Sequence, residues 1–386
     1  MPFFDPEAVA RVLQPRTAVE VEALGGEFAP VHRVVLDDGS TVVVKERRHG
    51  GAGWGYDAAN LRNERAALEI LGEVAGGAAV APRFVAGDVD AGVVVMTDLG
   101  TGRVLEPLLL DPNAGAEATA GLVELGRALG RFHAATASAV VHERFVSRRT
   151  ALGGPYDAAT ERTRYVIHDL AALWADVPGH AAALGFTPPS SVVDEEVAQL
   201  WRALADPGPF LALTHLDASP QNCVLGDDGG ARLVDFEGAG LRHLGLDAAF
   251  LRFPFPNYGH WSVLPEPVRA AMETTYRQTL VDGGIAAAAD DAAYDQAMAV
   301  GCATTVILRI HRLPRIADDD EQSLRRRTQM VSAIEVFRVA AATSGAFPKL
   351  ASWFGGLADE MRSRWTDANE RPREFPALPL HERVST

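Results

Sequence analysis

The side chains best suited to chemistry gather in one segment of the sequence, residues 213–240. Asp217 is followed five residues later by Asn222, and a short predicted hairpin then leads to Asp235 and Glu237. Carboxylate and amide oxygens are the ligands that Mg²⁺ prefers, usually one or two from the protein and the rest from water and phosphate. A further carboxylate on the same loop can accept the proton of an attacking hydroxyl group. Such a base beside an amide ligand and a carboxylate ligand indicates a phosphoryl-transfer site.

The predicted hairpin brings these groups together. Its strands are expected at residues 222–226 and 231–236, with the loop centred between Asp228 and Gly229. Symmetric pairing about that centre predicts that Asn222 lies opposite Asp235. Each polar residue of the segment, taken alone, is more typical of a turn. The joint pattern is rare, and it is the pattern that favours the functional interpretation.

The first hundred residues favour a small, mostly antiparallel sheet with one helix. An Asp-Gly pair at residues 38–39 predicts a tight turn between the second and third strands. The helix has apolar residues at three-to-four spacing, and Asp57 is expected to cap it. The expected strands are residues 19–24, 31–36, 41–46, 83–86 and 93–97, and the helix is residues 57–74.

The rest of the chain is expected to be mainly helical. The sequence therefore predicts an α+β protein of two lobes, with a smaller lobe at residues 1–100 and a larger helical lobe at residues 101–386. The Pro-rich end, residues 371–386, is expected to be a loosely packed tail. The predicted helices are residues 122–137, 158–175, 194–204, 267–279, 291–309 and 324–343.

Composition excludes several classes of protein. The 386 residues include 36 Lys and Arg and 51 Asp and Glu, so the formal net charge is −15. Such a chain has no general electrostatic attraction for nucleic acid or for anionic lipid. Two separated cysteines, Cys223 and Cys302, and no predicted signal peptide or membrane span favour a cytoplasmic protein. The sequence leaves the oligomeric state open.

The motif HLDASPQN, at residues 215–222, resembles the catalytic loop of the aminoglycoside phosphotransferase family, usually written HGDxxxxN. That family, with the related choline kinases, shares the two-lobed fold of protein kinases. Leu216 stands where the family commonly has Gly. The DFE at residues 235–237 resembles the family's metal-binding Asp-x-Asp/Glu, and Asp247 is similar to a family Asp that braces the catalytic loop.

The resemblance implies a role for each matching residue of the motif. Asp217 would be the base, or the carboxylate that orients the acceptor hydroxyl group. Asn222 and Asp235 would bind Mg²⁺, and Glu237 would reach a second metal ion. His215 would hold the loop rather than take part in the chemistry.

The resemblance also implies a nucleotide-phosphate contact in the smaller lobe. The family pairs a strand lysine with a helix glutamate, and Lys45 and Glu64 match these positions, with Glu69 as the second choice for the glutamate. Without the resemblance, Lys45 is equally typical of a solvated strand end and Glu64 of a solvated helix face.

Backbone groups are expected to complete the nucleotide site. Gly25 and Gly26 lie between the first two strands, where a kinase-like fold places a hairpin over the nucleotide. Thr97 and Leu99 lie in the connector between the lobes, where backbone groups would bond adenine. A second Gly-rich segment, residues 50–55, lacks the spacing of a dinucleotide-binding turn or a P-loop and is interpreted as a connector or lid.

Taken together, the sequence predicts an enzyme that moves the γ-phosphate of MgATP to a hydroxyl group of a small molecule, such as an antibiotic, an amino sugar or another metabolite. The net negative charge suits a cationic acceptor, and aromatic residues Phe253, Phe255, Tyr258 and Trp261 are candidates for its pocket. The alternatives are a kinase acting on Ser or Thr of a peptide and a non-catalytic nucleotide-binding scaffold. The identity of the acceptor, the choice between ATP and GTP and the number of metal ions stay open.

Overall fold

A computed structural model describes residues 4–24, 30–47, 58–74, 79–154, 156–165, 168–253, 255–257, 260–318 and 321–379. Within the strands and helices, the side chains of residues 255–257, 260, 261 and 321–325 are outside this description. Gly25, Gly26 and the 50–55 segment lie outside the described residues.

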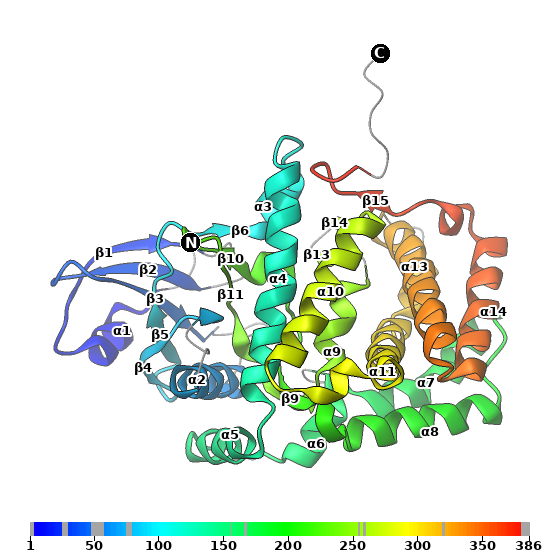
Figure 1. Cartoon of the computed structure of the whole chain (residues 1–386), viewed down its shortest axis with the longest axis horizontal. Coiled ribbons are helices and arrows are strands. Elements are labelled where there is room, and N and C mark those ends of the chain that lie inside the picture. The colour runs from blue at the N-terminus through cyan, green and yellow to red at the C-terminus, as the bar shows by residue number, and fades with distance from the viewer. Residues whose placement is uncertain are drawn as a thin grey trace.

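A five-stranded sheet forms the N-terminal part of the molecule (Figure 1). Its spatial order is β1-β2-β3-β5-β4, and every neighbouring pair is antiparallel. All five strands and the helix between β3 and β4 were expected from the sequence, within a few residues at their ends. The bounds are β1 Ala18–Ala23, β2 Val31–Leu36, β3 Thr41–Glu46, α2 Ala58–Glu73, β4 Phe84–Asp88 and β5 Val93–Thr97.

Two helices cover opposite faces of this sheet. On one face, α1 (Pro6–Leu13) packs Val9 and Leu13 into a cluster with Val34 and Val95. On the other face, the apolar side of α2 packs into the cluster that contains Val94. Because both faces are covered, β5 is buried over most of its length, as its run of apolar residues requires.

The helical part of the chain packs around two clusters of apolar side chains. One continues from α2 through α4 and α10, and the other joins α7, α8, α11, α13 and α14. None of the described helices is both long and apolar enough to cross a lipid bilayer. The helix bounds are α3 Leu105–Leu110, α4 Gly115–Thr136, α5 Ala139–Ala151, α6 Ala158–Arg162, α7 Leu170–Ala183, α8 Ser191–Ala205, α9 Gly245–Ala248, α10 Glu266–Asp282, α11 Asp291–Ile310, α12 Leu313–Ile316, α13 Glu321–Ser344 and α14 Pro348–Arg364.

Short strands connect these helices, and two of them form the predicted hairpin. They form small sheets of two or three strands beside the helices. Their bounds are β6 Arg103–Val104, β7 Arg164–Tyr165, β8 His168–Asp169, β9 Leu211–Thr214, β10 Cys223–Leu225, β11 Ala231–Leu233, β12 Gly240–His243, β13 Phe255–Asn257, β14 His260–Val263 and β15 Arg373–Glu374. The observed α+β architecture, a small antiparallel sheet followed by a mainly helical part, confirms the predicted protein-kinase-like fold class.

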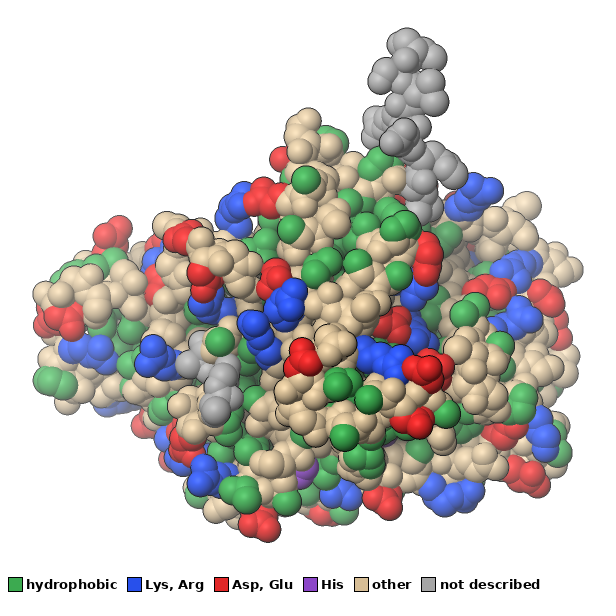
Figure 2. Space-filling model, in the orientation of Figure 1, with side chains coloured by type: hydrophobic (Ala, Val, Ile, Leu, Met, Phe, Trp, Pro, Cys, Tyr) green, Lys and Arg blue, Asp and Glu red, His purple; other side chains and the backbone are tan. Residues whose placement is uncertain are grey.

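Charged side chains of both signs are interspersed over the face of the molecule shown in Figure 2. Hydrophobic side chains are scattered among them on this face, and neither sign of charge forms a continuous field there. The excess of acidic residues is therefore spread over this surface and is not gathered in one patch.

Two sequence predictions about the helical part are wrong. The helix expected at residues 158–175 is divided into α6 and α7 by the β7–β8 hairpin, and Asp169 caps α7 by accepting a hydrogen bond from the Ala172 N–H. The C-terminal tail, as far as residue 379, is packed. Phe375 is 1% exposed, and the Ala377 N–H donates to the Leu109 carbonyl oxygen.

The predicted register of the β10–β11 hairpin is wrong by one residue. Asn222 lies opposite Val234, whose N–H donates to the Asn222 carbonyl oxygen over 3.0 Å, and not opposite Asp235. The physical reason is the length of the loop, residues 227–229. Because it has three residues, the hairpin is centred on Asp228 and not between two residues. Gly229 adopts a φ of +74°, the left-handed conformation that such loops require at their last position.

Candidate active site

The ammonium group of Lys45 is the centre of a cluster of carboxylates. Lys45 lies on β3 and is 6% exposed. Its Nζ is 2.8 Å from Glu64 Oε2 on α2 and 3.6 Å from Glu237 Oε2, and it also contacts Asp235 Oδ1. Burial alone would lower the pKa of Lys45, but Asp235, Glu64 and Glu237 outweigh it and raise that pKa. The lysine therefore stays charged and ties the sheet to the segment after β11.

The structure distinguishes the two candidate glutamates of α2. Glu64 is 1% exposed and faces Lys45. Glu69 instead pairs with Arg65 and Arg148, each at 2.8 Å. The first choice made from the sequence is therefore the glutamate that contacts the lysine.

Asp217 lies at the end of the loop that follows β9. Its Oδ2 accepts hydrogen bonds from Asn222 Nδ2 at 2.8 Å and from Gln221 Nε2 at 3.3 Å. Burial raises the pKa of Asp217 to about 7, and the negative charge of Asp235 acts in the same direction. Asp217 and Asp235, which are 18 positions apart in the sequence, therefore interact electrostatically in the folded chain.

Asn222 joins the loop to the hairpin. It is 8% exposed, and its Nδ2 also donates to the Asp217 carbonyl oxygen at 2.9 Å. Because the amide nitrogen is directed to Asp217, the amide oxygen is the atom that Asn222 can offer to a cation.

Asp247 holds this loop from beneath. Its Oδ2 accepts from the His215 N–H at 2.6 Å, and its Oδ1 accepts from the Leu216 N–H at 2.7 Å. His133 Nε2 lies 3.0 Å from Asp247 Oδ2, and the other ring nitrogen of His133 lies 2.9 Å from the Tyr276 hydroxyl group. Asp247 thus occupies the bracing position that the resemblance implied.

His215 fixes the loop through its ring. Its Nε2 donates to the Val234 carbonyl oxygen at 2.9 Å, and its Nδ1 accepts from the Asp217 N–H at 3.3 Å. The ring also packs against Phe236, with 4.7 Å between the ring centroids. These contacts connect the loop to β11 and leave His215 in a structural position.

Two residues of the site have left-handed backbone conformations. Leu216 has a φ of +66° and Asp235 a φ of +72°. A non-glycine residue in this region costs about 1–3 kcal/mol and is found where the surroundings fix it, often at functional sites. The two hydrogen bonds from Asp247 fix the loop at Leu216, and its φ gives a physical reason for the glycine that is common at this position.

Thr97 and Leu99 lie where the sheet connects to the helical part. The Thr97 N–H donates to the Arg83 carbonyl oxygen, and the Thr97 hydroxyl oxygen accepts from the Arg83 N–H, both at 2.9 Å. The N–H and hydroxyl groups of Thr97 are therefore both hydrogen-bonded to Arg83. Leu99 is partly exposed, beside an Asp98 that pairs with Arg33 at 2.8 Å.

The oxygen donors of the site fit Mg²⁺ held partly by the protein. Within the residues that the structure describes, no group of three or more His, Cys, Asp or Glu side chains is arranged to hold a metal ion alone. Asn222, Asp235 and Glu237 offer amide and carboxylate oxygens, the donor set of a cation that keeps water and phosphate among its ligands. These three side chains therefore fit a Mg²⁺ ion that is held partly by the protein and partly by water and phosphate.

Three supporting residues were not expected from the sequence. Asn63 donates from Nδ2 to the Glu237 carbonyl oxygen at 3.3 Å, and the Tyr165 hydroxyl group donates to the Leu216 carbonyl oxygen at 2.6 Å. The third is His133, which contacts Asp247. Its place on the apolar side of the helix predicted at residues 122–137 was the one sign in the sequence that it is buried.

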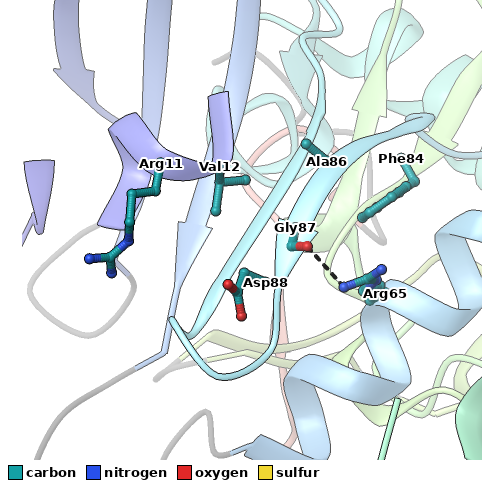
Figure 3. A pocket seen from close by; sticks show the side chains of 7 residues that line it. All are labelled: Arg11, Val12, Arg65, Phe84, Ala86, Gly87 and Asp88. Carbon is teal, nitrogen blue, oxygen red and sulfur yellow. Dashed lines mark hydrogen bonds between the residues drawn. The ribbon is translucent and has the colours of Figure 1, made fainter. Parts of the chain in front are cut away.

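A hollow among the described residues lies away from this site (Figure 3). It has a volume of about 460 Å³ and is lined by α1, α2 and β4. Arg65 lies along one wall and donates to the Gly87 carbonyl oxygen at 2.9 Å, while Arg11 lies on the side of α1. None of the predicted site residues lines this hollow.

Of the four aromatic residues expected to line an acceptor pocket, the side chain of Phe253 is described. It is 3% exposed and packs in the cluster of α11 and α13. Phe255, Tyr258 and Trp261 have side chains outside the described residues.

Comparison with known proteins places the chain among phosphotransferases. A family model described as the phosphotransferase enzyme family matches residues 20–282, which is more than half of the chain. A search of curated proteins found no match.

Solved structures with a similar fold include three kinases of small molecules. An aminoglycoside phosphotransferase from Alicyclobacillus acidocaldarius is 15% identical with a TM-score of 0.49, covering 94% of this chain and 98% of that chain. A choline/ethanolamine kinase family protein from Mesorhizobium loti is 16% identical with a TM-score of 0.46, covering 88% and 92%. A choline kinase from Streptococcus pneumoniae is 15% identical with a TM-score of 0.42, covering 82% and 93%.

Proposed function

Because the chain belongs to the phosphotransferase enzyme family, we propose that it transfers the γ-phosphate of MgATP to a hydroxyl group of a small molecule. The observation that carries the proposal is the convergence of two other segments, α2 with Glu64 and residues 235–237, on Lys45 of β3. Asp217 interacts electrostatically with Asp235 of this cluster. Catalysis of phosphoryl transfer consists mainly of positioning and charge neutralisation, which is what such a constellation offers.

In this proposal the two parts of the chain divide the work. Residues 1–100 bind the nucleotide, and residues 101–386 hold the catalytic loop and bind the acceptor. Lys45 binds nucleotide phosphates, and Glu64 fixes its position. Gly25 and Gly26, with backbone groups of Thr97 and Leu99 in the connector, complete the nucleotide site.

The metal ion would be held by Asn222 and Asp235, with Glu237 as a further ligand. When bound, Mg²⁺ would supply positive charge that neutralises the nucleotide phosphates. Asp217 accepts the proton of the acceptor hydroxyl group, or orients that group toward the phosphate. Lys45, which contacts Asp235 and Glu237 directly, would move toward the phosphates once they bind.

The test is ADP release with MgATP across a panel of hydroxylated compounds. The panel contains aminoglycosides, macrolides, amino sugars, choline, nucleosides and a Ser/Thr peptide. Asp217→Asn should lose turnover by about 10²–10⁴-fold, the usual contribution of a positioned base. Asp227→Asn is the matched control, since Asp227 is an exposed aspartate in the β10–β11 loop, and it should keep wild-type turnover.

Each outcome decides a part of the proposal. Turnover that survives in Asp217→Asn would overturn the assignment of the base. Turnover of the peptide alone would favour a protein kinase. Failure to bind MgATP, measured by calorimetry, would overturn both the kinase and the nucleotide-binding scaffold.

A further inference from the structure

Asn63 of α2 links the segment that carries Asp235 and Glu237 to a helix of the helical part. Its Nδ2 donates to the Glu237 carbonyl oxygen at 3.3 Å, and its Oδ1 accepts from Arg149 Nε on α5 at 2.7 Å. An arginine side chain can only donate and a carbonyl oxygen can only accept, so a single orientation of the Asn63 amide satisfies both partners. Arg149 therefore fixes which atom of the amide is turned toward Glu237.

Arg149 is itself held by further contacts. It is 3% exposed, and its Nη1 donates to the Gly153 carbonyl oxygen at 3.0 Å. Its guanidinium carbon lies 5.4 Å from the ring centroid of Tyr156, within the range of a cation–π interaction. Because the guanidinium group is planar and rigid, these contacts also set the direction of its Nε. Arg149 thus presents one fixed donor to Asn63.

The backbone that bears the proposed metal ligands needs such support. Asp235 has a φ of +72°, a left-handed conformation that its surroundings must maintain. The short helical turn that follows it is held at Gly238, whose carbonyl oxygen accepts from Arg242 Nη1 at 3.0 Å. Glu237 lies between these two residues, and its carbonyl oxygen is held by Asn63. The hydrogen bond from α2 therefore helps to fix the directions in which the Asp235 and Glu237 side chains leave the backbone.

The neighbouring Arg148 makes a contrasting contact between the same two helices. It joins α5 to α2 through ion pairs with Glu69 and Glu73, each at 2.8 Å. Of the two arginines, Arg149 is the one whose partner on α2 donates to Glu237. An effect of docking α5 against α2 would therefore appear in variants of both arginines, and an effect on the metal-binding segment in variants of Arg149.

We propose that Asn63 and Arg149 are positioning residues for the metal ion: Arg149 orients the Asn63 amide, and that amide holds the backbone that bears Asp235 and Glu237. The inference rests on the proposed function, in which these two carboxylates are ligands of Mg²⁺. It adds a role for α2, which thereby positions the phosphate-binding lysine and the metal ligands together.

The test measures how much Mg²⁺ strengthens nucleotide binding, without turnover. ADP is titrated by calorimetry into the full chain with Mg²⁺ and again with EDTA, and the ratio of the two affinities is the Mg²⁺ enhancement. Asn63→Asp keeps the shape of the side chain and an acceptor for Arg149, but it turns a carboxylate oxygen toward the Glu237 carbonyl group and loses that hydrogen bond. Arg149→Met removes the donor that orients the amide. Arg148→Met is the matched control.

We expect Asn63→Asp and Arg149→Met each to reduce the Mg²⁺ enhancement by about tenfold, the effect of losing a group that orients a metal ligand. The ADP affinity in EDTA should stay near the wild-type value, because Lys45 and Glu64 are unchanged. Arg148→Met should keep the wild-type Mg²⁺ enhancement.

Thermal unfolding separates positioning from a purely structural role. Asn63→Asp keeps Arg149 paired, so its Tm should lie close to that of the wild type while its Mg²⁺ enhancement falls. A wild-type Mg²⁺ enhancement in Asn63→Asp, or an equal loss in Arg149→Met and Arg148→Met, would overturn the inference and leave the proposed function standing. A wild-type chain that binds no MgADP would overturn the proposed function, and the inference with it.

Discussion

At the scale of single residues, the site depends on charges that are compensated by one another and not by water. Lys45 and Glu64 are nearly inaccessible, so each requires the other. Asp235 and Glu237 are more open and share the same ammonium group. Such a buried ion pair contributes little net stability when intact, but removing one partner leaves the other uncompensated.

Lys45→Met tests this dependence. The substitution leaves three carboxylates facing one another, and we expect the free energy of unfolding to fall by about 3 kcal/mol, with KM for MgATP raised as well. Urea denaturation and steady-state kinetics measure the two effects. Lys349→Met is the control, because Lys349 is the chain's other lysine and is exposed, and it should change stability by less than about 0.5 kcal/mol. A Lys45→Met protein as stable as wild type would contradict the view that Lys45 neutralises the three carboxylates.

At the scale of elements, the catalytic loop keeps its left-handed turn because neighbouring elements hold it. Asp247, on α9, binds two successive N–H groups of the loop, and His133, on α4, binds Asp247. The strain at Leu216 is therefore maintained by a buried network that joins α4, α9 and the loop.

Asp247→Asn should weaken that network. An amide has one acceptor oxygen where the carboxylate has two, so one loop N–H would face a donor and lose its hydrogen bond. We expect a loss of about 2 kcal/mol in the free energy of unfolding. Because the loop positions Asp217, kcat should fall at least tenfold while KM for MgATP stays nearly constant. Asp282→Asn, at the exposed end of α10, should change neither quantity. A parallel fall in stability with unchanged kcat would show that Asp247 has a structural role alone.

The position of α9 depends in turn on its close approach to α11. A Cβ atom built on Gly301 of α11 would lie 1.8 Å from the Gly245 carbonyl oxygen. Gly301→Ala should therefore force the two helices apart and cost about 3 kcal/mol or more in stability. Gly356→Ala, in the exposed part of α14 where a Cβ would meet nothing within 4 Å, should instead stabilise the protein by up to about 1 kcal/mol. Thermal unfolding of both variants tests the contrast, and a similar Tm for the two would contradict it.

At the scale of the whole molecule, the excess of acidic residues is a property of the surface and not of the site. The chain has a formal charge of −15. The acidic residues are spread over the surface, as on the face in Figure 2, where solvent and salt screen them. Lys45 and Glu64 are buried and therefore screened less, so local charges and not the net charge set the field within the site.

Buried histidines make the stability of the molecule depend on pH. Burial lowers the pKa of His243 to about 4, and the nearby His133 acts in the same direction. In the unfolded chain the same ring has a pKa near 6.5, so between these values the unfolded state binds a proton that the native state does not. Stability is therefore full above about pH 6.5 and falls as the pH is lowered toward 4, by about 3 kcal/mol from this group.

Tm measured from pH 7.5 to 4.5 should follow that fall. His243→Asn keeps an acceptor near the Gly245 N–H and lacks the titrating group, so its Tm should depend less on pH in this range. Equal slopes for the variant and the wild type would exclude His243 as the source.

The sequence by itself determined the elements and the types of residue in the site. Strand alternation, the Asp-Gly turn and the helical spacing predict the five-stranded sheet, because these signals are local in the chain. The motif with Asp217 and Asn222 was visible for the same reason. The hairpin register was not, since it depends on whether the loop has two or three residues and on the φ of Gly229.

The tertiary structure alone decided which of these residues meet. Lys45 lies 190 residues before Asp235, and no local pattern measures the distance between their side chains. The choice of Glu64 over Glu69 depends on which side of α2 faces β3, and the bracing of the loop by His133 depends on how α4 packs beside α9. These meetings depend on how elements that lie far apart in the chain pack together, which a local sequence pattern does not encode.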